Sequence, residues 1–261
     1  MNELESILGQ STAVRSFVLD EVLKIVDGHK ISANAVKEYS TDIVDWLRPV
    51  IDLKGFSIYP MNGITEALNW WTMVEGRRIK KLEGDYQWLK ERRPQSEDVI
   101  WYQSIPSSID GNFRQPLKEN ALALDLAYLG STSIQQIPLS DNIEYVFYSL
   151  SKGFGLRNYR IGWMFTRKPD AELDNLIYGA KYYNYFATKL GEKIIQKFPI
   201  DYVFNKIRPL QEQICQRLDL RASDSVWLAH SRDEKFSKFR RSGDVARICL
   251  SPLIREEMNG I

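Results

Sequence analysis

Short apolar segments recur along this chain, and their spacing constrains its fold more than any other feature. Six segments have the length and composition of strands, at 56–61, 78–83, 99–103, 121–126, 143–148 and 161–166. Several are continuously apolar rather than alternating, which is typical of strands buried on both faces of a parallel sheet. Segments of helical or loop character separate them. We therefore expect an α/β fold with a mostly parallel central sheet flanked by helices.

The length predicts one large domain with a smaller appendage, since 261 residues correspond to about 1.7 domains of about 150 residues each. We expect an N-terminal helical segment over 1–30 and a large α/β domain over 31–198. The remaining residues, 199–261, should form a reduced α+β domain.

Apolar periodicity also predicts the helices, at 3–28, from about 40 to 50, at 65–75, from 170 to about 198, and at 203–218. The long helix that follows Pro169 should be softly interrupted at Gly179 and Gly191. Two strands are expected in the smaller domain, at 226–229 and 246–250.

Charge and cysteine content exclude several classes of protein. The 35 Lys and Arg residues nearly balance the 34 Asp and Glu residues, so no nucleic-acid partner is expected. No run approaches the roughly 18 apolar residues of a membrane span, and the acidic start lacks the apolar core of a signal peptide. We therefore expect a cytoplasmic protein with no membrane partner. Two cysteines and two histidines are too few to predict a disulfide framework or a metal centre.

A lysine directly follows the strand predicted at 143–148, within Ser149-Leu150-Ser151-Lys152, and Arg160 lies further on. In α/β proteins, reactive groups tend to lie where parallel strands end. A lysine amine at such a place can act as a nucleophile. Hydroxyl groups and an arginine nearby suit a phosphate, because both donate hydrogen bonds to anionic oxygens. The alternative is that Lys152 is an ordinary exposed lysine, as most lysines are.

Two further segments place polar groups after predicted strands. Asp125 lies at the end of one predicted strand with Tyr128 three residues on, and Asn62-Gly63-Ile64-Thr65 joins the first strand to the helix at 65–75. The start of that helix presents free backbone N–H groups to an anion. Each segment alone also fits an ordinary turn or helix start. The occurrence of all three segments in one order favours a shared site.

Together the three segments resemble the fold-type-I enzymes that depend on pyridoxal 5'-phosphate (PLP), specifically the class I/II aminotransferases. The resemblance implies that Lys152 forms a Schiff base with the cofactor aldehyde. It also implies a set of residues that hold the cofactor phosphate: Gly63, Ile64, Thr65, Ser149 and Arg160. The first three correspond to the family's Gly-x-Thr-Glu-Ala segment, and the last two to its Ser-x-x-Lys…Arg signature.

The resemblance assigns the cofactor ring to other residues. Asp125 is expected to pair with the protonated pyridine nitrogen, which makes the ring an electron sink, and Tyr128 to bind the ring oxygen. Tyr86 is the candidate for stacking on the ring, with Trp88 as the substitute, although a plain core aromatic is a close alternative for either residue. The family's asparagine that also binds the ring oxygen is replaced here by Ser108. This departure bears on the reaction rather than on cofactor binding.

Substrate contacts and assembly carry less specific signals. Arg247, on the strand at 246–250, is the candidate for binding the substrate carboxylate, because a guanidinium matches a carboxylate in geometry. An exposed arginine beside a strand is a close alternative, and three other arginines compete for the role: Arg240, Arg241 and Arg255. Members of the family place their sites at two-fold interfaces, with a tyrosine of the partner chain that reaches the phosphate. A homodimer is therefore expected, and Tyr39 is the candidate for this binding residue. The aromatic segment of Tyr182, Tyr183, Tyr185 and Phe186 offers more apolar surface than one core face needs.

These observations predict an unusually short PLP-dependent aminotransferase that acts on an amino acid or related amine through Lys152, with Asp125 and Tyr128 as the other catalytic residues. Two alternatives stay open. One is another PLP reaction on an amino acid, by a lyase, decarboxylase or oxidase, because the cofactor supplies the chemistry for all of them. The other is a PLP-binding remnant without catalysis, since the family's N-terminal arm and much of its small domain are trimmed.

Overall fold

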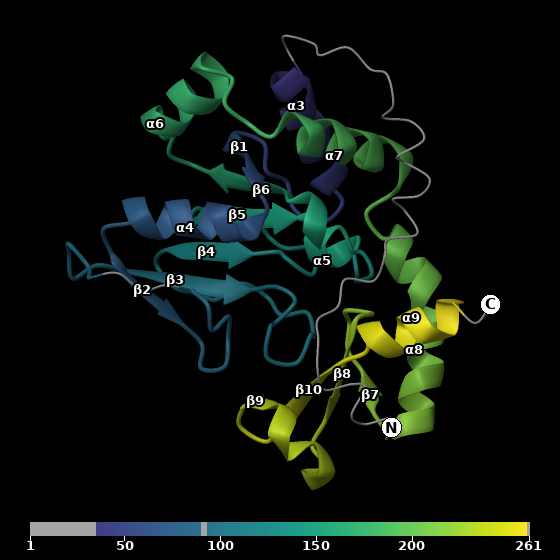
Figure 1. Ribbon diagram of the computed structural model, residues 1–261. Helices are drawn as coiled ribbons and strands as arrows, with labels where there is room; N and C mark the ends of the chain where they lie inside the picture. Colours follow the sequence, from purple (N-terminus) through teal and green to yellow (C-terminus); the bar gives the residue numbers. More distant parts are fainter. Residues whose placement is uncertain (1–34, 90–92, 260–261) are drawn as a thin grey trace.

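The computed structural model describes residues 35–89 and 93–259, and the helix expected at 3–28 lies outside them. A six-stranded sheet in the order β1-β6-β5-β4-β3-β2 forms its centre (Figure 1). The strands are β1 (Ser57–Asn62), β2 (Arg78–Lys81), β3 (Val99–Ser104), β4 (Leu122–Asp125), β5 (Ile143–Ser149) and β6 (Ile161–Thr166). All six strands predicted for the large domain are present.

The strand directions bring most strand ends to one edge of the sheet. β2, β3, β4 and β5 are parallel, whereas β6 is antiparallel to both β5 and β1. β1 therefore runs in the same direction as β5, and β6 alone is reversed. This confirms the mostly parallel α/β fold. Pro60 is tolerated in β1 because β1 is an edge strand.

Helices cover both faces of this sheet, so that two apolar cores form. α3 (Ala35–Leu47) and α7 (Tyr185–Lys197) pack on one face, and α4 (Ile64–Val74) packs on the other. Successive residues of β5 alternate between the two cores, with Tyr148 in the first and Phe147 in the second. The helix predicted from about 40 to 50 is α3, which ends at Leu47, two residues before Pro49.

The single long helix predicted from 170 to 198 is wrong, because the structure has two helical pieces there. α6 (Ala171–Leu173) continues into a π-helix, η2 (Asp174–Gly179), and α7 begins only after a turn. In that turn Lys181 is left-handed, with φ of 56°. Asn184 then caps α7, since its side chain accepts the N–H of the third residue along. Tertiary packing thus overrides a continuous helical pattern.

Gly191 does not interrupt α7. A Cβ atom at this position would lie 2.0 Å from the hydroxyl oxygen of Tyr39 on α3. The glycine therefore serves close packing between the two helices rather than flexibility.

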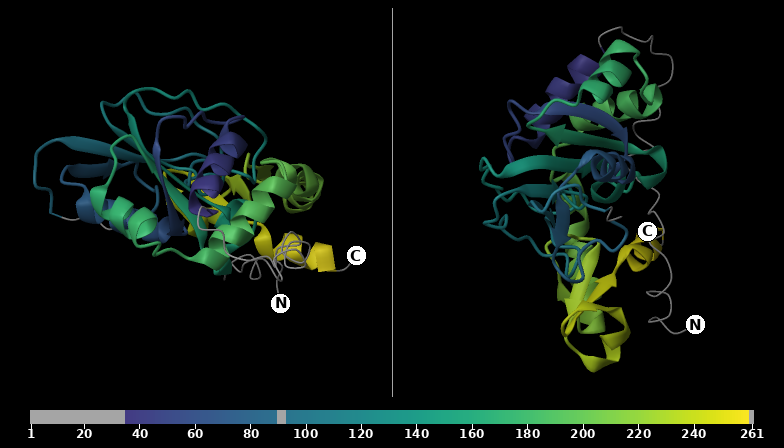
Figure 2. Two further views of the ribbon diagram at one scale, coloured as in Figure 1. Left: turned by 90° about the horizontal axis from the view of Figure 1, so that it is seen from above. Right: turned by 90° about the vertical axis from the view of Figure 1, so that its left-hand side faces the viewer.

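The C-terminal part of the chain forms a second, smaller layer. Its elements are α8 (Tyr202–Leu218), β7 (Arg221–Ala222), β8 (Leu228–Ser231), β9 (Arg240–Ser242), β10 (Val245–Cys249) and α9 (Ser251–Asn259). The four strands form an antiparallel sheet in the order β7-β8-β10-β9. This sheet lies at the end of the molecule opposite α3 (Figure 2). The predicted helix and both predicted strands of the small domain correspond to α8, β8 and β10.

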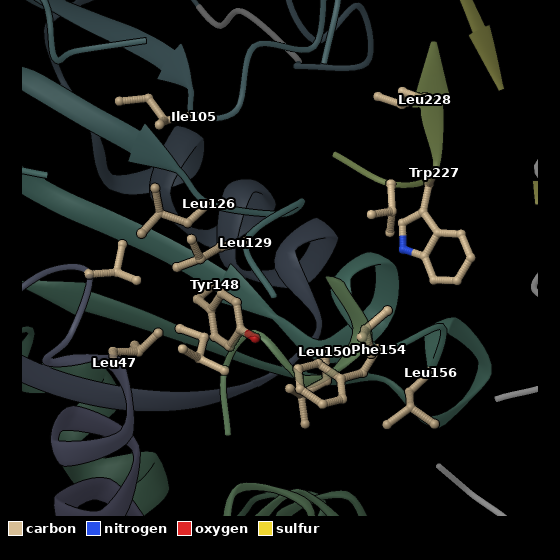
Figure 3. Close-up of a cluster of buried hydrophobic side chains, with 14 of the residues drawn as sticks. Leu47, Ile105, Leu126, Leu129, Tyr148, Leu150, Phe154, Leu156, Trp227 and Leu228 are labelled. Carbon is tan, nitrogen blue, oxygen red and sulfur yellow. The ribbon is translucent and has the colours of Figure 1, made fainter. Parts of the chain in front are cut away.

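One apolar core continues from the large sheet into this smaller layer. Trp227 and Leu228 belong to the same buried cluster as Leu150 and Phe154, which follow β5 (Figure 3). The two parts of the chain are therefore packed together, and the domain division at residue 199 stays a prediction. In the part of the chain that the structure describes, no helix has both the length and the apolarity that crossing a membrane requires.

Candidate active site

A cavity of about 330 Å³ lies where the parallel strands end. Trp227, Leu228 and Cys249 of the smaller layer close one side of it. Eight residues that the sequence predicted for the site line this cavity: Ile64, Thr65, Tyr86, Asp125, Tyr128, Ser149, Lys152 and Arg160. Segments far apart in the sequence meet here because the C-terminal ends of parallel strands share one edge of the sheet.

One end of the cavity combines a glycine, an arginine and a helix start. Gly63 precedes α4 with φ of 76° and ψ of 174°, and no side chain caps this helix. Arg160 donates to the carbonyl of Asn62 from Nε at 3.1 Å and Nη2 at 2.8 Å. A Cβ atom at Gly63 would lie 2.6 Å from Arg160 Nη2. Only glycine fits this backbone conformation and this contact, which leaves the helix N–H groups beside a guanidinium.

Lys152 lies in a single helical turn, α5 (Leu150–Gly153), directly after β5. Its Nζ is 4.5 Å from the centre of the Tyr128 ring and 5.9 Å from that of Tyr86. Ser151 on the same turn and Ser149, the last residue of β5, also line the cavity. The hydroxyl of Ser151 is buried and has no hydrogen-bond partner among the described residues. A buried hydroxyl of this kind indicates a missing acceptor, and an anionic ligand would supply one.

Asp125 is a buried carboxylate at the end of β4. Its Oδ1 accepts the Ala127 N–H at 2.7 Å, and its Oδ2 accepts the Tyr102 hydroxyl at 2.5 Å. Burial raises the pKa of Asp125 above its ordinary value, while the Tyr102 hydrogen bond and the Lys152 charge act in the opposite direction. Two donors fix the orientation of the carboxylate, and one side of it faces the cavity.

The tyrosine hydroxyls differ because their neighbours differ. Burial tends to raise the pKa of Tyr128, but the charges of Lys152 and Arg247 outweigh burial, and the pKa is lowered. Burial raises the pKa of Tyr86, against the opposing charge of Lys152. Tyr128 is thus a strong hydrogen-bond donor in a positive environment, as a partner for an oxyanion should be.

Ser108 does not lie in the cavity wall. Its hydroxyl donates to Asp85 Oδ1 at 2.5 Å, and Asp85 also accepts the Ser104 hydroxyl at 2.7 Å and the Tyr86 N–H at 2.7 Å. The Ser108 hydroxyl is therefore already hydrogen-bonded to another protein side chain. The contact expected between Ser108 and the ring oxygen of the cofactor is not supported. Arg247 does not line the cavity either. Its Nη1 donates to the Ser108 carbonyl at 2.6 Å, although its charge reaches Tyr128.

Tyr39 is not placed to reach a second chain. Its side chain is 1% exposed and its ring packs against Trp163, with centroids 5.1 Å apart. The prediction that Tyr39 crosses a dimer interface therefore does not fit the structure. Burying this large aromatic ring in the core between α3 and β6 removes more apolar area from water, and so stabilises the fold more, than leaving it at the surface.

Several residues of the cavity wall, such as Ser151 and Trp227, and the supporting residues Tyr102 and Asp85 were not assigned to the site from the sequence. Ser151 could have been found, because it immediately precedes Lys152. Tyr102 and Asp85 reach Asp125 and Ser108 only through contacts between β3, β4 and the loop after β2, and no local pattern announces such contacts. Among the described residues, no group of three or more His, Cys, Asp or Glu is placed to hold a metal ion.

Comparison with solved structures identifies the class to which this fold belongs. An aminotransferase from Staphylococcus aureus superposes with a TM-score of 0.60 at 13% identity, over 92% of this chain and 87% of that one. Histidinol-phosphate aminotransferase from Sinorhizobium meliloti, solved with pyridoxal-5'-phosphate, has a TM-score of 0.63 at 12% identity, over 93% and 88%. L-threonine-O-3-phosphate decarboxylase from Porphyromonas gingivalis has a TM-score of 0.59 at 15% identity, over 95% and 99%.

The chain therefore has the fold of the fold-type-I aminotransferases, as the resemblance of its motifs implied. No protein-family model matches the sequence, and no curated protein matches it at a significant level. At these identities the likeness concerns the fold, so the chemistry has to be argued from the cavity itself.

Proposed function

We propose that this protein is a PLP-dependent aminotransferase acting on an amino acid or related amine. The observation that carries the proposal is the convergence of Lys152, Asp125, Tyr128 and Arg160 on one cavity at the strand ends. The fold, shared with aminotransferases, supports the same conclusion.

The chain's own atoms fit the cofactor at its phosphate end. The uncapped start of α4, the Arg160 guanidinium and the partnerless Ser151 hydroxyl together offer several donors to one anion. Three of the five N–H groups of Arg160 donate to the carbonyls of Asn62 and Arg157, which fixes the guanidinium while two others remain for a ligand. Charge-assisted hydrogen bonds of this kind are strong.

The ring end of the cavity has complementary chemistry. Asp125 would hold the pyridine nitrogen in its protonated form, Tyr128 would donate to the ring oxygen, and Tyr86 would restrain one ring face. When bound, PLP supplies an electron-poor ring that stabilises negative charge on the substrate α-carbon. No contact from Ser108 is needed, because Tyr128 can serve the ring oxygen alone.

Lys152 would bind the cofactor aldehyde through Nζ and, once displaced by a substrate amine, move a proton at the substrate α-carbon. Its position over the Tyr128 ring keeps Nζ inside the cavity. Arg247 would orient the substrate through its carboxylate by turning from the Ser108 carbonyl that it now binds. Positioning of this kind sets which substrate bond is exposed to Lys152.

Labelling of Lys152 tests cofactor binding. Purified protein supplied with PLP should be yellow, and borohydride should fix the cofactor on one peptide that contains Lys152. Lys152→Ala should lose this label, whereas Lys118→Ala, an exposed lysine outside the cavity, should keep it. A colourless protein that takes up no PLP would contradict the proposal.

A half-reaction tests the type of chemistry. The PLP-loaded protein, mixed with a panel of amino acids, should release a keto acid and retain the amino group on the cofactor. Release of carbon dioxide, ammonia or a cleaved side chain would instead indicate a decarboxylase, oxidase or lyase. PLP binding with no reaction on any amine would favour the non-catalytic alternative.

We also infer a homodimer. A second cavity, of about 420 Å³, lies between η2 and α7 and adjoins Asn62, whose carbonyl binds Arg160. Beside it Leu176, Tyr182 and Phe186 are 37%, 74% and 49% exposed, an apolar surface that a second copy of the chain would cover. Light scattering should give the mass of a dimer. Phe186→Ser should weaken the association of the two chains. A stable monomer with bound PLP would refute the assembly.

A further inference from the structure

Both carboxylate oxygens of Asp125 accept a hydrogen bond. One of the two donors, the Tyr102 hydroxyl, has no role in the proposed function. Ala127 donates a backbone N–H to Oδ1, whereas Tyr102 donates its hydroxyl to Oδ2 at 2.5 Å. Tyr102 lies on β3, is fully buried, and packs its ring on Trp71 of α4. It does not line the cavity, so it acts on the site only through Asp125.

The Tyr102 hydroxyl is a permanent donor. Burial raises its pKa well above the ordinary value, and the neighbouring carboxylates of Asp125 and Asp85 raise it further. The hydroxyl proton points to Asp125, because the nearby Ser104 hydroxyl is 2.7 Å from Asp85 Oδ1 but 3.4 Å from the Tyr102 oxygen. Ser104 thus gives its own proton to Asp85 and does not compete for Asp125.

Several groups act on Asp125 from the elements around it. Burial favours its neutral form, and the charge of Asp85 does the same. The Tyr102 hydrogen bond opposes them most strongly, followed by the charge of Lys152 on α5 and the Ala127 N–H. Tyr86, another titratable neighbour, is itself affected by the Asp125 charge. Among the protein groups, Tyr102 therefore contributes most to keeping the carboxylate ionised.

We propose that Tyr102 is a positioning residue that keeps Asp125 ionised and fixed, and thereby controls protonation of the pyridine nitrogen of the bound cofactor. The inference rests on the proposed function, since it concerns the PLP site. Burial and the charge of Asp85 raise the pKa of Asp125, and the hydrogen bond from Tyr102 lowers it. Without this hydrogen bond, Asp125 takes up a proton at higher pH.

The test is the pH dependence of PLP affinity, measured by absorbance or fluorescence titration over the pH range in which the protein stays folded. Affinity should fall on the acid side, where Asp125 becomes neutral. In Tyr102→Phe this acid limb should move to higher pH by about 1 to 2 units, the size expected for a hydrogen bond to a charged group. The absorbance of bound PLP should change over the same pH range.

Tyr148→Phe is the matched control. Tyr148 is equally buried, but its hydroxyl has no hydrogen-bond partner among the described residues. Its removal should leave the acid limb in place. A merely structural effect of deleting a buried hydroxyl would move both variants alike, which would overturn the inference.

A fluorinated tyrosine introduced at position 102 alone gives a second arm that does not depend on the folding of Tyr102→Phe. Its more acidic hydroxyl is a stronger donor, so the acid limb should move to lower pH. An acid limb that stays at the wild-type position in either substituted protein overturns the role of Tyr102, while the PLP site stands. Failure of the wild-type protein to bind PLP refutes the proposed function, and the inference falls with it.

Discussion

Gly63 offers a sharp test of the phosphate end of the site, because two separate costs meet at one residue. Its backbone, with φ of 76° and ψ of 174°, lies in a region that only glycine adopts readily. A Cβ atom there would lie 2.6 Å from Nη2 and 2.9 Å from Cζ of Arg160. Gly63→Ala therefore strains the backbone and also displaces the guanidinium.

The two costs appear in different measurements. Backbone strain should lower the free energy of unfolding by about 1–3 kcal/mol, which corresponds to a drop of about 2–12 °C in Tm for a chain of this size. Displacement of the Arg160 guanidinium weakens its hydrogen bond to the phosphate, for which about 1.5–3 kcal/mol is typical. The affinity for PLP should therefore fall by about 10- to 150-fold.

Gly55→Ala separates the two effects. Gly55 also has a positive φ, of 88°, but a Cβ atom there meets nothing within 4 Å. This variant should lose stability from strain alone and bind PLP as the wild type does. Thermal unfolding of the cofactor-free proteins and PLP titration provide both readouts. Wild-type affinity in Gly63→Ala would refute the placement of the phosphate beside Arg160.

Two further predictions concern stability. Arg77→Met should cost about 1–3 kcal/mol at neutral pH, because Arg77 binds Glu144 through two hydrogen bonds and lowers its pKa. A carboxyl group with a lowered pKa stabilises the fold at pH values above the ordinary Glu pKa, and this stabilisation is lost as the pH falls through the lowered pKa. In urea unfolding, the difference in free energy between the wild type and Arg77→Met should therefore be smaller in acid than at neutral pH. An equal difference at both pH values would contradict this. Gln211→Leu should cost about 1–3 kcal/mol, because the two N–H groups of its buried amide are shared among three backbone carbonyls within 223–228. Exposed Gln213→Leu should leave Tm unchanged. Equal Tm values for both variants would refute the reasoning.

Cavity-lining residues were predictable where a strand ends and a helix or turn begins. Asp125 and Ser149 lie where apolar runs end, and the parallel order of those runs places their ends at one edge. Gly63 follows β1 at the same edge, next to the cavity-lining Ile64. Burial and local backbone geometry, which short stretches of sequence encode, set these positions. Lys152 lies in the same cavity as Ser149 because its helical turn, α5, directly follows β5, which ends at Ser149.

Side-chain partners could not be predicted in the same way. Ser108 binds Asp85 rather than facing the cavity, and Tyr39 is buried under α7. The sequence around each of these residues looks no different from that around a cavity or interface residue. The break between η2 and α7 has the same origin, since an apolar pattern at helical spacing continues across it. Competing contacts between distant segments decide such outcomes.

The sequence by itself determined the α/β class and the six strands of the large sheet, with each strand end placed to within about two residues, because hydrophobic periodicity is a local property. Tertiary structure alone decided that β6 is reversed, that the smaller layer closes the cavity with Trp227, and that Tyr102 reaches Asp125. Each of these depends on which strands become neighbours. Strand order fixes contacts between residues far apart in the chain, and the free energy of those contacts is absent from any local segment.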